Sequence, residues 1–144
     1  MYEKYSRQAL PSKKYRELLG SALCVFNSNN QFVIENVLRL DNSKYNWYEL
    51  IDKTSGELFE PIKETITNES GTEITILFSE LVSIRNRIVH SFQITENDNQ
   101  ILRTKNNKHE QYNITEDYLL EFIRKNEELS DMLNKFRGSS IQND

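Results

Sequence analysis

The sequence predicts a single domain that is mainly α-helical. A chain of 144 residues fits one domain with one buried core. The chain has 37% apolar and 28% charged residues with only four Gly and two Pro, and this composition favours helices joined by few turns over a strand-rich sandwich. Apolar residues also recur every three or four positions along much of the chain, which is the repeat of an amphipathic helix.

The first predicted helix extends from Ser12 to Leu40. Its apolar residues keep one helical phase and are Leu19, Leu23, Phe26, Val33, Val37 and Leu40. The polar stretch Asn27–Asn30 lies in the middle of this helix. Because Asn and Ser side chains compete for backbone hydrogen bonds, a break between two helices at this stretch is the alternative.

Two shorter helical segments are predicted to follow. A loop at residues 41–45 leads to a short helix around residues 47–51. The sequence Thr-Ser-Gly-Glu at residues 54–57 is typical of a capping box. It opens a helix through residues 58–66, in which Pro61 lies near the first turn, where proline is tolerated. Residues 68–71 end this helix.

The next predicted helix begins at Thr72, whose side chain is expected to cap it. Glu73 in the first turn suits the positive end of the helix dipole. One face of this helix is almost wholly apolar, so we expect that face to lie in the core. It consists of Ile74, Leu77, Leu81, Ile84 and Ile88.

A short β-hairpin, or another ordered excursion, is predicted before the last helix. Residues 93–95 and 101–103 flank a turn-rich tetrapeptide at residues 96–99. Thr115 is then expected to cap a final helix, which Gly138 ends. The predicted domain therefore covers residues 1–138, and residues 139–144 form a flexible C-terminal tail.

The composition excludes several classes of function. The single cysteine, Cys24, cannot form an intramolecular disulfide or a cysteine-based metal site, and its apolar neighbours indicate a small core side chain. Neither His90 nor His109 belongs to a ligand-spaced cluster, so no metal or other cofactor is expected. No stretch resembles a signal sequence or a membrane span, which predicts a cytoplasmic protein. The net charge of −4 disfavours a broad electrostatic grip on nucleic acid, so any such contact is local.

Groups suited to phosphate chemistry are concentrated in the sequence Arg-Asn-Arg-Ile-Val-His-Ser-Phe at residues 85–92. On an ideal helix Arg85 lies about 60° from the core direction. An unpaired guanidinium is costly there, so Arg85 needs an anionic partner or a path to solvent, and an intramolecular ion pair is the simplest explanation. A small polar stripe lines the opposite side, where an ordinary solvated face is the simplest explanation. It consists of Ser79, Ser83, Asn86 and His90.

The combination matches what metal-free RNA cleavage requires. Histidine is the side chain best suited to removing a proton from a 2′-hydroxyl near neutral pH, which is the role expected of His90. Arg85 offers a permanent charge and a planar fork of donors to the phosphoryl oxygens, and Asn86 offers an uncharged donor. A second Arg-to-His spacing, from Arg103 to His109, lies in a polar stretch without helical periodicity and is interpreted as a chance match.

The motif Arg85-Asn86-Arg87-Ile88-Val89-His90 resembles the Arg-x(4–6)-His signature of the HEPN superfamily, in which a polar residue follows the arginine. The order of a long helix, shorter middle helices, a motif-bearing helix and a closing helix is similar too. This resemblance implies a helical bundle that dimerises and pairs two motifs in one cleft. It implies a metal-independent endoribonuclease, commonly a toxin or an anti-phage defence effector, with Arg85 and His90 catalytic and Asn86 supporting.

Further expectations concern the contacts of this site. Arg87 and Ser83 are the other residues of the helix that we expect to contact RNA, and an antitoxin or another defence-system protein is an expected partner. Some HEPN toxins paired with nucleotidyltransferase antitoxins carry Arg-x4-His-x-Tyr, but here the last position is Phe92. Inhibition by adenylylation of that position is therefore not expected.

Helical geometry supports a homodimer independently of the resemblance. Arg85 and His90 are five positions apart, so on an ideal helix their side chains point about 140° apart. A two-fold axis beside the helix brings the arginine of one chain near the histidine of the other. The alternative is that the helix unwinds at residues 89–92 and the site forms within each subunit.

Two other functions compete with RNA cleavage. The first is a HEPN-like module that binds a nucleotide, RNA or a partner protein without cutting it, which the acidic net charge and Phe92 favour. The second is a helical structural protein in which the motif is accidental.

Overall fold

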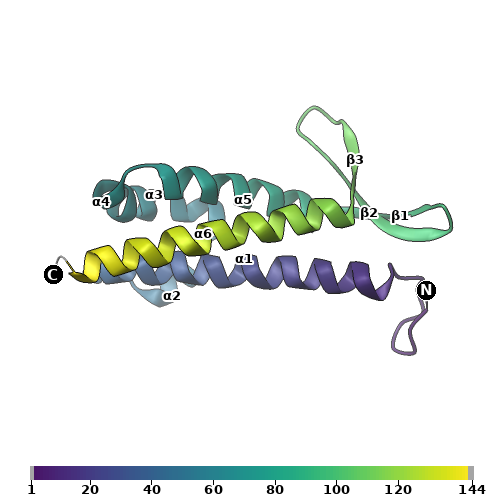
Figure 1. Ribbon diagram of the computed structural model, residues 1–144, viewed down its shortest axis with the longest axis horizontal. Coiled ribbons are helices and arrows are strands. Elements are labelled where there is room, and N and C mark those ends of the chain that lie inside the picture. Colours follow the sequence, from purple (N-terminus) through teal and green to yellow (C-terminus); the bar gives the residue numbers. More distant parts are fainter. Residues whose placement is uncertain (1, 143–144) are drawn as a thin grey trace.

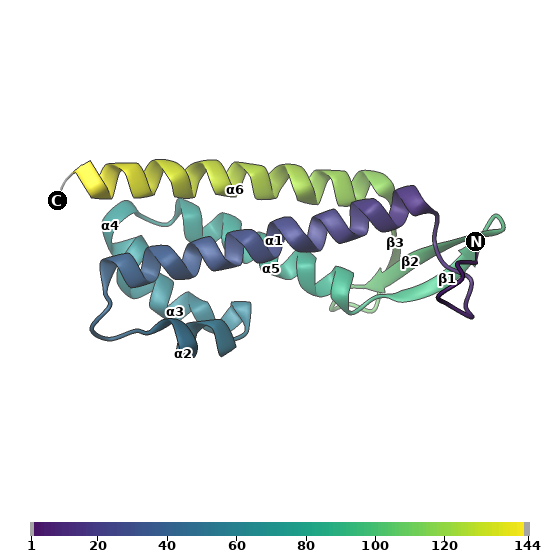
Figure 2. The ribbon, with the colours of Figure 1, turned by 90° about the horizontal axis from the view of Figure 1, so that it is seen from below.

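The computed structural model describes residues 2–142, with side chains from residue 2 to residue 139 (Figure 1). Its body consists of the long helices α1 (Lys13–Leu40), α5 (Glu73–Val89) and α6 (Glu116–Gln142). Helices α1 and α6 run side by side in the same direction, and α5 runs in the opposite direction (Figures 1 and 2). The mainly α-helical fold predicted from the sequence is confirmed.

Contacts between α1 and α6 occur in the same order along both helices. Lys14 pairs with Glu116 near the start of each helix, at 3.6 Å. In the middle, Asn29 Nδ2 donates to the backbone oxygen of Asn126 at 2.7 Å. This bond explains why α1 continues through the Asn-rich stretch: the polar group of Asn29 is satisfied by the neighbouring helix and does not compete with its own backbone. The alternative of a break at residues 27–30 is wrong.

The core is organised around Phe26 of α1. Its ring stacks on Phe78 of α5, with 6.3 Å between the centroids, and on Phe122 of α6, with 6.1 Å. Phe26 therefore joins all three long helices. Cys24 lies two positions away, or about 200° around the helix, which places it on the opposite side of α1. It is exposed, so the expectation that Cys24 is a core side chain is wrong.

The segment between α1 and α5 is helical but irregular. After α2 (Trp47–Asp52) the chain forms η1 (Ser55–Leu58), α3 (Phe59–Ile62), η2 (Lys63–Thr67) and α4 (Asn68–Ser70). The predicted capping box is present between Thr54 and Glu57. The helical pitch then changes from 3-10 in η1 to α in α3 and π in η2, whereas the sequence predicted one regular helix. Thr65 Oγ1 donates to the backbone oxygen of Pro61 at 2.7 Å, and Ser70 Oγ donates to that of Ile66 at 3.0 Å. Such side-chain bonds to the preceding turn bend helices.

Two predicted helix boundaries are wrong: the cap at the start of α5 and the end of α6. Thr72 has helical dihedral angles (φ −95°, ψ −5°) and its side chain makes no capping bond. The turn that separates α4 from α5 depends instead on Gly71, which adopts φ +87°. Thr115 caps α6 as predicted, since its Oγ1 accepts from the amide of Tyr118 at 3.0 Å. However, α6 continues through Gly138 to Gln142, so the predicted end of the helix at Gly138 is wrong.

A three-stranded antiparallel sheet lies at one end of the bundle (Figure 2). Strands β1 (Phe92–Glu96) and β2 (Asn99–Lys105) form the predicted hairpin, whose turn residues Asn97 and Asp98 both have positive φ, as tight hairpin turns require. Strand β3 (Gln111–Ile114) pairs with the other edge of β2 and was not predicted. Its four residues alternate too briefly for the sequence to indicate a strand.

Tyr15 of α1 attaches this sheet to the bundle. Its side chain is almost fully buried, and its hydroxyl donates to the backbone oxygen of Ile114 at 2.6 Å. The hydroxyl oxygen of Tyr15 also accepts from the amide of Leu102 at 3.2 Å. One hydroxyl therefore satisfies a backbone donor of β2 and a backbone acceptor of β3, and burial raises the pKa of Tyr15.

Replacing Tyr15 by Phe should destabilise the protein by about 1–3 kcal/mol, because two buried backbone groups lose their partner. The free energy of unfolding in urea measures this loss. Tyr48→Phe is the matched control, since the ring of Tyr48 is 77% exposed. Equal stability of the two variants would contradict the role assigned to Tyr15.

Candidate functional site

Arg85 lies on the flank of α5 that faces α1. Its guanidinium carbon is 4.9 Å from the centroid of the Phe26 ring, a cation–π contact. The Nε atom is buried and has no hydrogen-bond partner, and burial lowers the pKa of Arg85. Among the described residues no carboxylate pairs with it, so the expected intramolecular ion pair is wrong. Arg85 is a half-buried cation without an anion.

Arg39 provides a comparison within the same protein. Its guanidinium also covers an aromatic ring, that of Phe136, at 5.5 Å, and its Nε is buried and unbonded as well. However, Arg39 Nη2 donates to the side-chain oxygen of Asn36 at 2.6 Å. For Arg85 no acceptor of this kind lies among residues 2–139. A desolvated guanidinium of this kind favours an anion from outside the chain.

The polar stripe of α5 faces solvent as predicted. Ser79, Ser83 and His90 are exposed and Asn86 is half-buried. Two exposed apolar side chains accompany the stripe, Ile76 (65% exposed) and Val89 (54%). None of these six side chains is an acid, a lysine or an arginine.

His90 ends α5 as its C-terminal cap. Its amide still donates to the backbone oxygen of Asn86 at 2.9 Å, as a residue inside a helix does. The chain therefore does not unwind before His90, and the helical separation of about 140° from Arg85 is retained. The guanidinium of Arg85 contacts the ring of Phe26, whereas the side chain of His90 is exposed, so we expect the two side chains to point apart within one chain.

Arg87 has a structural contact of its own. Its Nη1 donates to the backbone oxygen of Lys105 at 2.6 Å and so ties α5 to β2. Tyr112 of β3 and Tyr118 of α6 lie beside it, with their ring centroids 5.9 Å apart. Burial, followed by the hydrogen bond with Tyr112, raises the pKa of Tyr118, and the charge of Arg87 opposes this shift. Arg87 thus positions the sheet next to the motif.

The second Arg-to-His spacing lies on an ordered segment. Arg103 is on β2, and its Nε donates to the side-chain oxygen of Asn113 at 2.9 Å. His109 is in the turn after β2, with φ +66°. The sequence-based interpretation of this stretch was that it is polar and without helical periodicity, and the clustering of positive charge around it was not predicted. Residues 85–109 contain five Lys or Arg and two Asp or Glu, a net charge of +3 in a chain of net charge −4.

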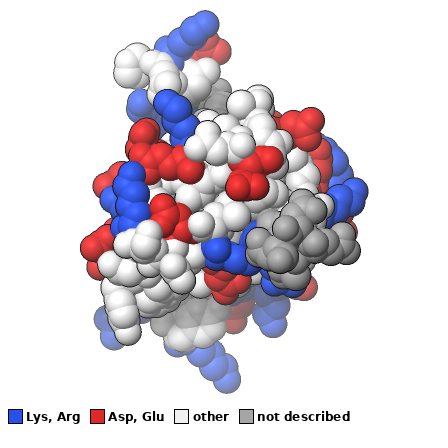
Figure 3. All heavy atoms as spheres, turned by 90° about the vertical axis from the view of Figure 1, so that its left-hand side faces the viewer, with Lys and Arg blue, Asp and Glu red and all other residues white. Residues whose placement is uncertain are grey.

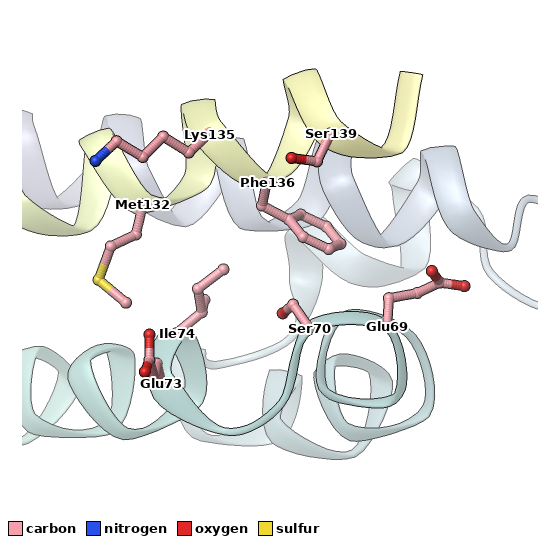
Figure 4. A pocket seen from close by; sticks show the side chains of 8 residues that line it. All are labelled: Glu69, Ser70, Glu73, Ile74, Met132, Lys135, Phe136 and Ser139. Atoms are coloured by element: carbon pink, nitrogen blue, oxygen red, sulfur yellow. The ribbon is translucent and has the colours of Figure 1, made fainter. Parts of the chain in front are cut away.

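The opposite end of the molecule has a different character. A hollow of about 310 Å³ lies there between the start of α5 and the end of α6, with Ile74, Met132 and Phe136 beside Glu73 and Lys135 (Figure 4). The α5 helix begins at this hollow and ends at the motif, a span of about 25 Å at 1.5 Å per residue. Acidic and basic side chains are interspersed on this end face (Figure 3). The hollow is therefore separate from Arg85 and His90.

Comparisons with protein-family models, with curated proteins and with solved structures found no match for this chain. Among the described residues, no three His, Cys, Asp or Glu side chains gather in a way that could hold a metal ion. In the same part of the chain, none of the helices has the length and apolar character needed to cross a membrane.

Replacing Arg85 by Met should leave the free energy of unfolding unchanged or raise it slightly. Methionine keeps the contact with Phe26 and removes a desolvated charge that has no partner. Arg16→Met is the matched control and should lower stability, because Arg16 donates to Glu3 at 2.7 Å and to Tyr5 at 2.7 Å. Urea unfolding measures both. A loss above about 1.5 kcal/mol for Arg85→Met would show that Arg85 serves stability.

Proposed function

We propose that the protein is a metal-independent endoribonuclease of HEPN type, with Arg85 and His90 as its catalytic residues. One observation carries the proposal: Arg85 is a half-buried cation to which no described residue supplies an anion, five positions before an exposed histidine at the end of the same helix. A structural arginine is expected to have a partner in its own chain. By the resemblance to HEPN proteins, the natural role is that of a toxin or an anti-phage defence effector.

The reaction follows from the chemistry of the two side chains. His90 removes the proton of a 2′-hydroxyl, and the 2′-oxygen attacks the adjacent phosphorus. The bond from phosphorus to the 5′-oxygen breaks, leaving a 2′,3′-cyclic phosphate, and the departing 5′-oxygen takes up a proton. Arg85 stabilises the charge on the phosphoryl oxygens, with Asn86 as a further donor.

The proposed active unit is a homodimer. Arg85 and His90 point apart within one chain, so a two-fold axis beside α5 is the simplest way to combine them. The polar stripe of α5 suits such an interface, because its small residues lie beside the exposed side chains of Ile76 and Val89.

The non-catalytic alternative rests on one observation as well. The guanidinium of Arg85 contacts the Phe26 ring, and on an ideal helix its side chain lies about 140° from that of His90. A monomer with this geometry binds an anion through Arg85 and lacks a base beside it. Such a protein is a HEPN-like module that binds a nucleotide, RNA or a partner protein without cutting it.

Purified protein should cleave labelled RNA in excess chelator and leave a 2′,3′-cyclic phosphate. A 2′-deoxy substitution at the mapped cut site should prevent cleavage, because the attacking hydroxyl is missing. Arg85→Ala and His90→Ala should each reduce the rate by about 100-fold or more, as expected for loss of a general base or of an oxyanion donor.

Arg124→Ala and His109→Ala are the matched controls and should retain activity, since Arg124 is an exposed residue of α6 and His109 lies in the β2–β3 turn. Cleavage of the deoxy substrate would rule out attack by the 2′-hydroxyl. Full activity of the His90→Ala variant would show that His90 is not the general base.

Mixed dimers test whether the two catalytic side chains come from different subunits. Arg85→Ala and His90→Ala chains should be inactive alone, and co-expressed and purified as a mixed dimer they should regain part of the activity. In that dimer one site keeps both side chains and the other site has neither. If both side chains came from one chain, every site would lack one of them.

Light scattering at micromolar concentration should show a dimer. A strictly monomeric protein that cuts RNA would overturn the proposal that two chains together form the active site. If verified mixed dimers are inactive, two explanations remain. Either the site lies within one chain, or a single cleft needs all four side chains. Tethered dimers with one substituted residue separate them, because only the second case abolishes all activity.

A further inference from the structure

The sheet has one face against the helices and one face toward solvent. Along a strand, successive side chains point to opposite faces. Thr104 and Ile114 are fully buried, and Tyr112 packs against Tyr118 of α6, so these residues define the inner face. The part of the other face nearest α5 is called the outer face here. It consists of Phe92, Arg103, Lys105, Gln111 and Asn113.

The pairing register places an aromatic ring beside a cation on this outer face. Phe92 of β1 is directly opposite Arg103 of β2, which is directly opposite Asn113 of β3. Side chains paired in this way are about 5 Å apart at Cβ. The Phe92 ring is 44% exposed. Arg103 uses its Nε for Asn113, and among residues 2–139 no acceptor engages its two terminal nitrogens.

The outer face adjoins the candidate catalytic residues. Phe92 follows His90 by two residues. Lys105 lies two residues beyond Arg103 on the same strand, and its backbone oxygen accepts from Arg87 of α5. The ring, the two cations and the exposed histidine therefore lie at the junction of α5 and the sheet, within the segment of net charge +3.

We propose that the outer face binds single-stranded RNA, with an unpaired base stacked on Phe92 and the neighbouring phosphates held by Arg103 and Lys105. This inference rests on the proposed function, since it supplies the path of the strand that His90 and Arg85 cut. Stacking on exposed aromatic rings next to a basic groove is the general mode of single-strand binding. Gln111 adds an amide group that can bond to base edges, whereas the amide of Asn113 is engaged by Arg103 and by the carboxylate of Glu96.

Two properties of the outer face favour this occupant over others. In a duplex the bases stack on one another, so none is free to cover Phe92. Protein interfaces are depleted of lysine, whereas the outer face includes Lys105. The positive charge is also local, in agreement with an acidic chain that contacts only a few phosphates.

The test measures binding of a fluorescein-labelled single-stranded RNA whose 2′-hydroxyls are all methylated, so that it cannot be cut. Fluorescence anisotropy should give an increase in Kd of about tenfold for Phe92→Leu, as for loss of one stacked base, and no change for Phe92→Tyr, which keeps the ring. Arg103→Gln and Lys105→Gln should each weaken binding and reduce the slope of log affinity against log salt by about 0.7. A duplex of the same sequence should bind more weakly.

Tyr48→Leu and Arg124→Gln are the matched controls and should bind as the unaltered protein does, since both residues are exposed and lie on α2 and α6. Circular dichroism verifies the fold of each variant. Wild-type affinity of Phe92→Leu, equal binding of duplex and single strand, or no binding by the unaltered protein would overturn the proposal.

Assaying the same variants on unmethylated RNA separates this inference from the proposed function. Binding that depends on Phe92 in a protein that never cuts RNA would overturn the cleavage mechanism and support the outer face as a binding site. Cleavage by a protein whose Phe92→Leu variant binds normally would overturn the outer face alone.

Discussion

The stacking of Phe26 on Phe78 and Phe122 is the interaction on which the rest of the structure depends. It lies where α1, α5 and α6 meet, and replacing such a ring by Ala in a packed core typically costs about 3–5 kcal/mol. The same ring carries the guanidinium of Arg85 on its remaining side. The residue that organises the core therefore also fixes the orientation of the candidate catalytic arginine, so the site is coupled to the packing of the whole bundle.

The sheet is held to this bundle by the burial of Ile114 in the core and by polar contacts that a few side chains make. The Tyr15 hydroxyl links α1 to β2 and β3, and Arg87 links α5 to β2. Because both contacts use backbone atoms of the strands, they constrain the position of the sheet without occupying its outer side chains. An acidic helical protein thus acquires a small basic, aromatic surface at one end, beside the motif-bearing helix.

Much of this architecture was predictable from local patterns. The continuous α1, the hairpin and the cap at Thr115 follow from helical periodicity, turn chemistry and capping preference. Strand β3 and the extension of α6 past Gly138 depend on tertiary contacts or on the absence of a stop signal, which local propensity does not encode. For the site, the burial of Arg85 was predictable from its angle on the helix. Its partner was not, because an aromatic ring on α1, 59 positions earlier in the sequence, took the place of the expected carboxylate.

Cys24 has a practical consequence. It is the single cysteine of the 144-residue sequence, and it is exposed on the side of α1 that faces away from Phe26. A thiol-reactive spin label or fluorophore therefore attaches at one known point of an otherwise unaltered chain. In a symmetric pair of chains the two labels report a single distance across the two-fold axis. The arrangement of subunits in solution is thus open to spectroscopic measurement without introducing any residue that the protein does not already have.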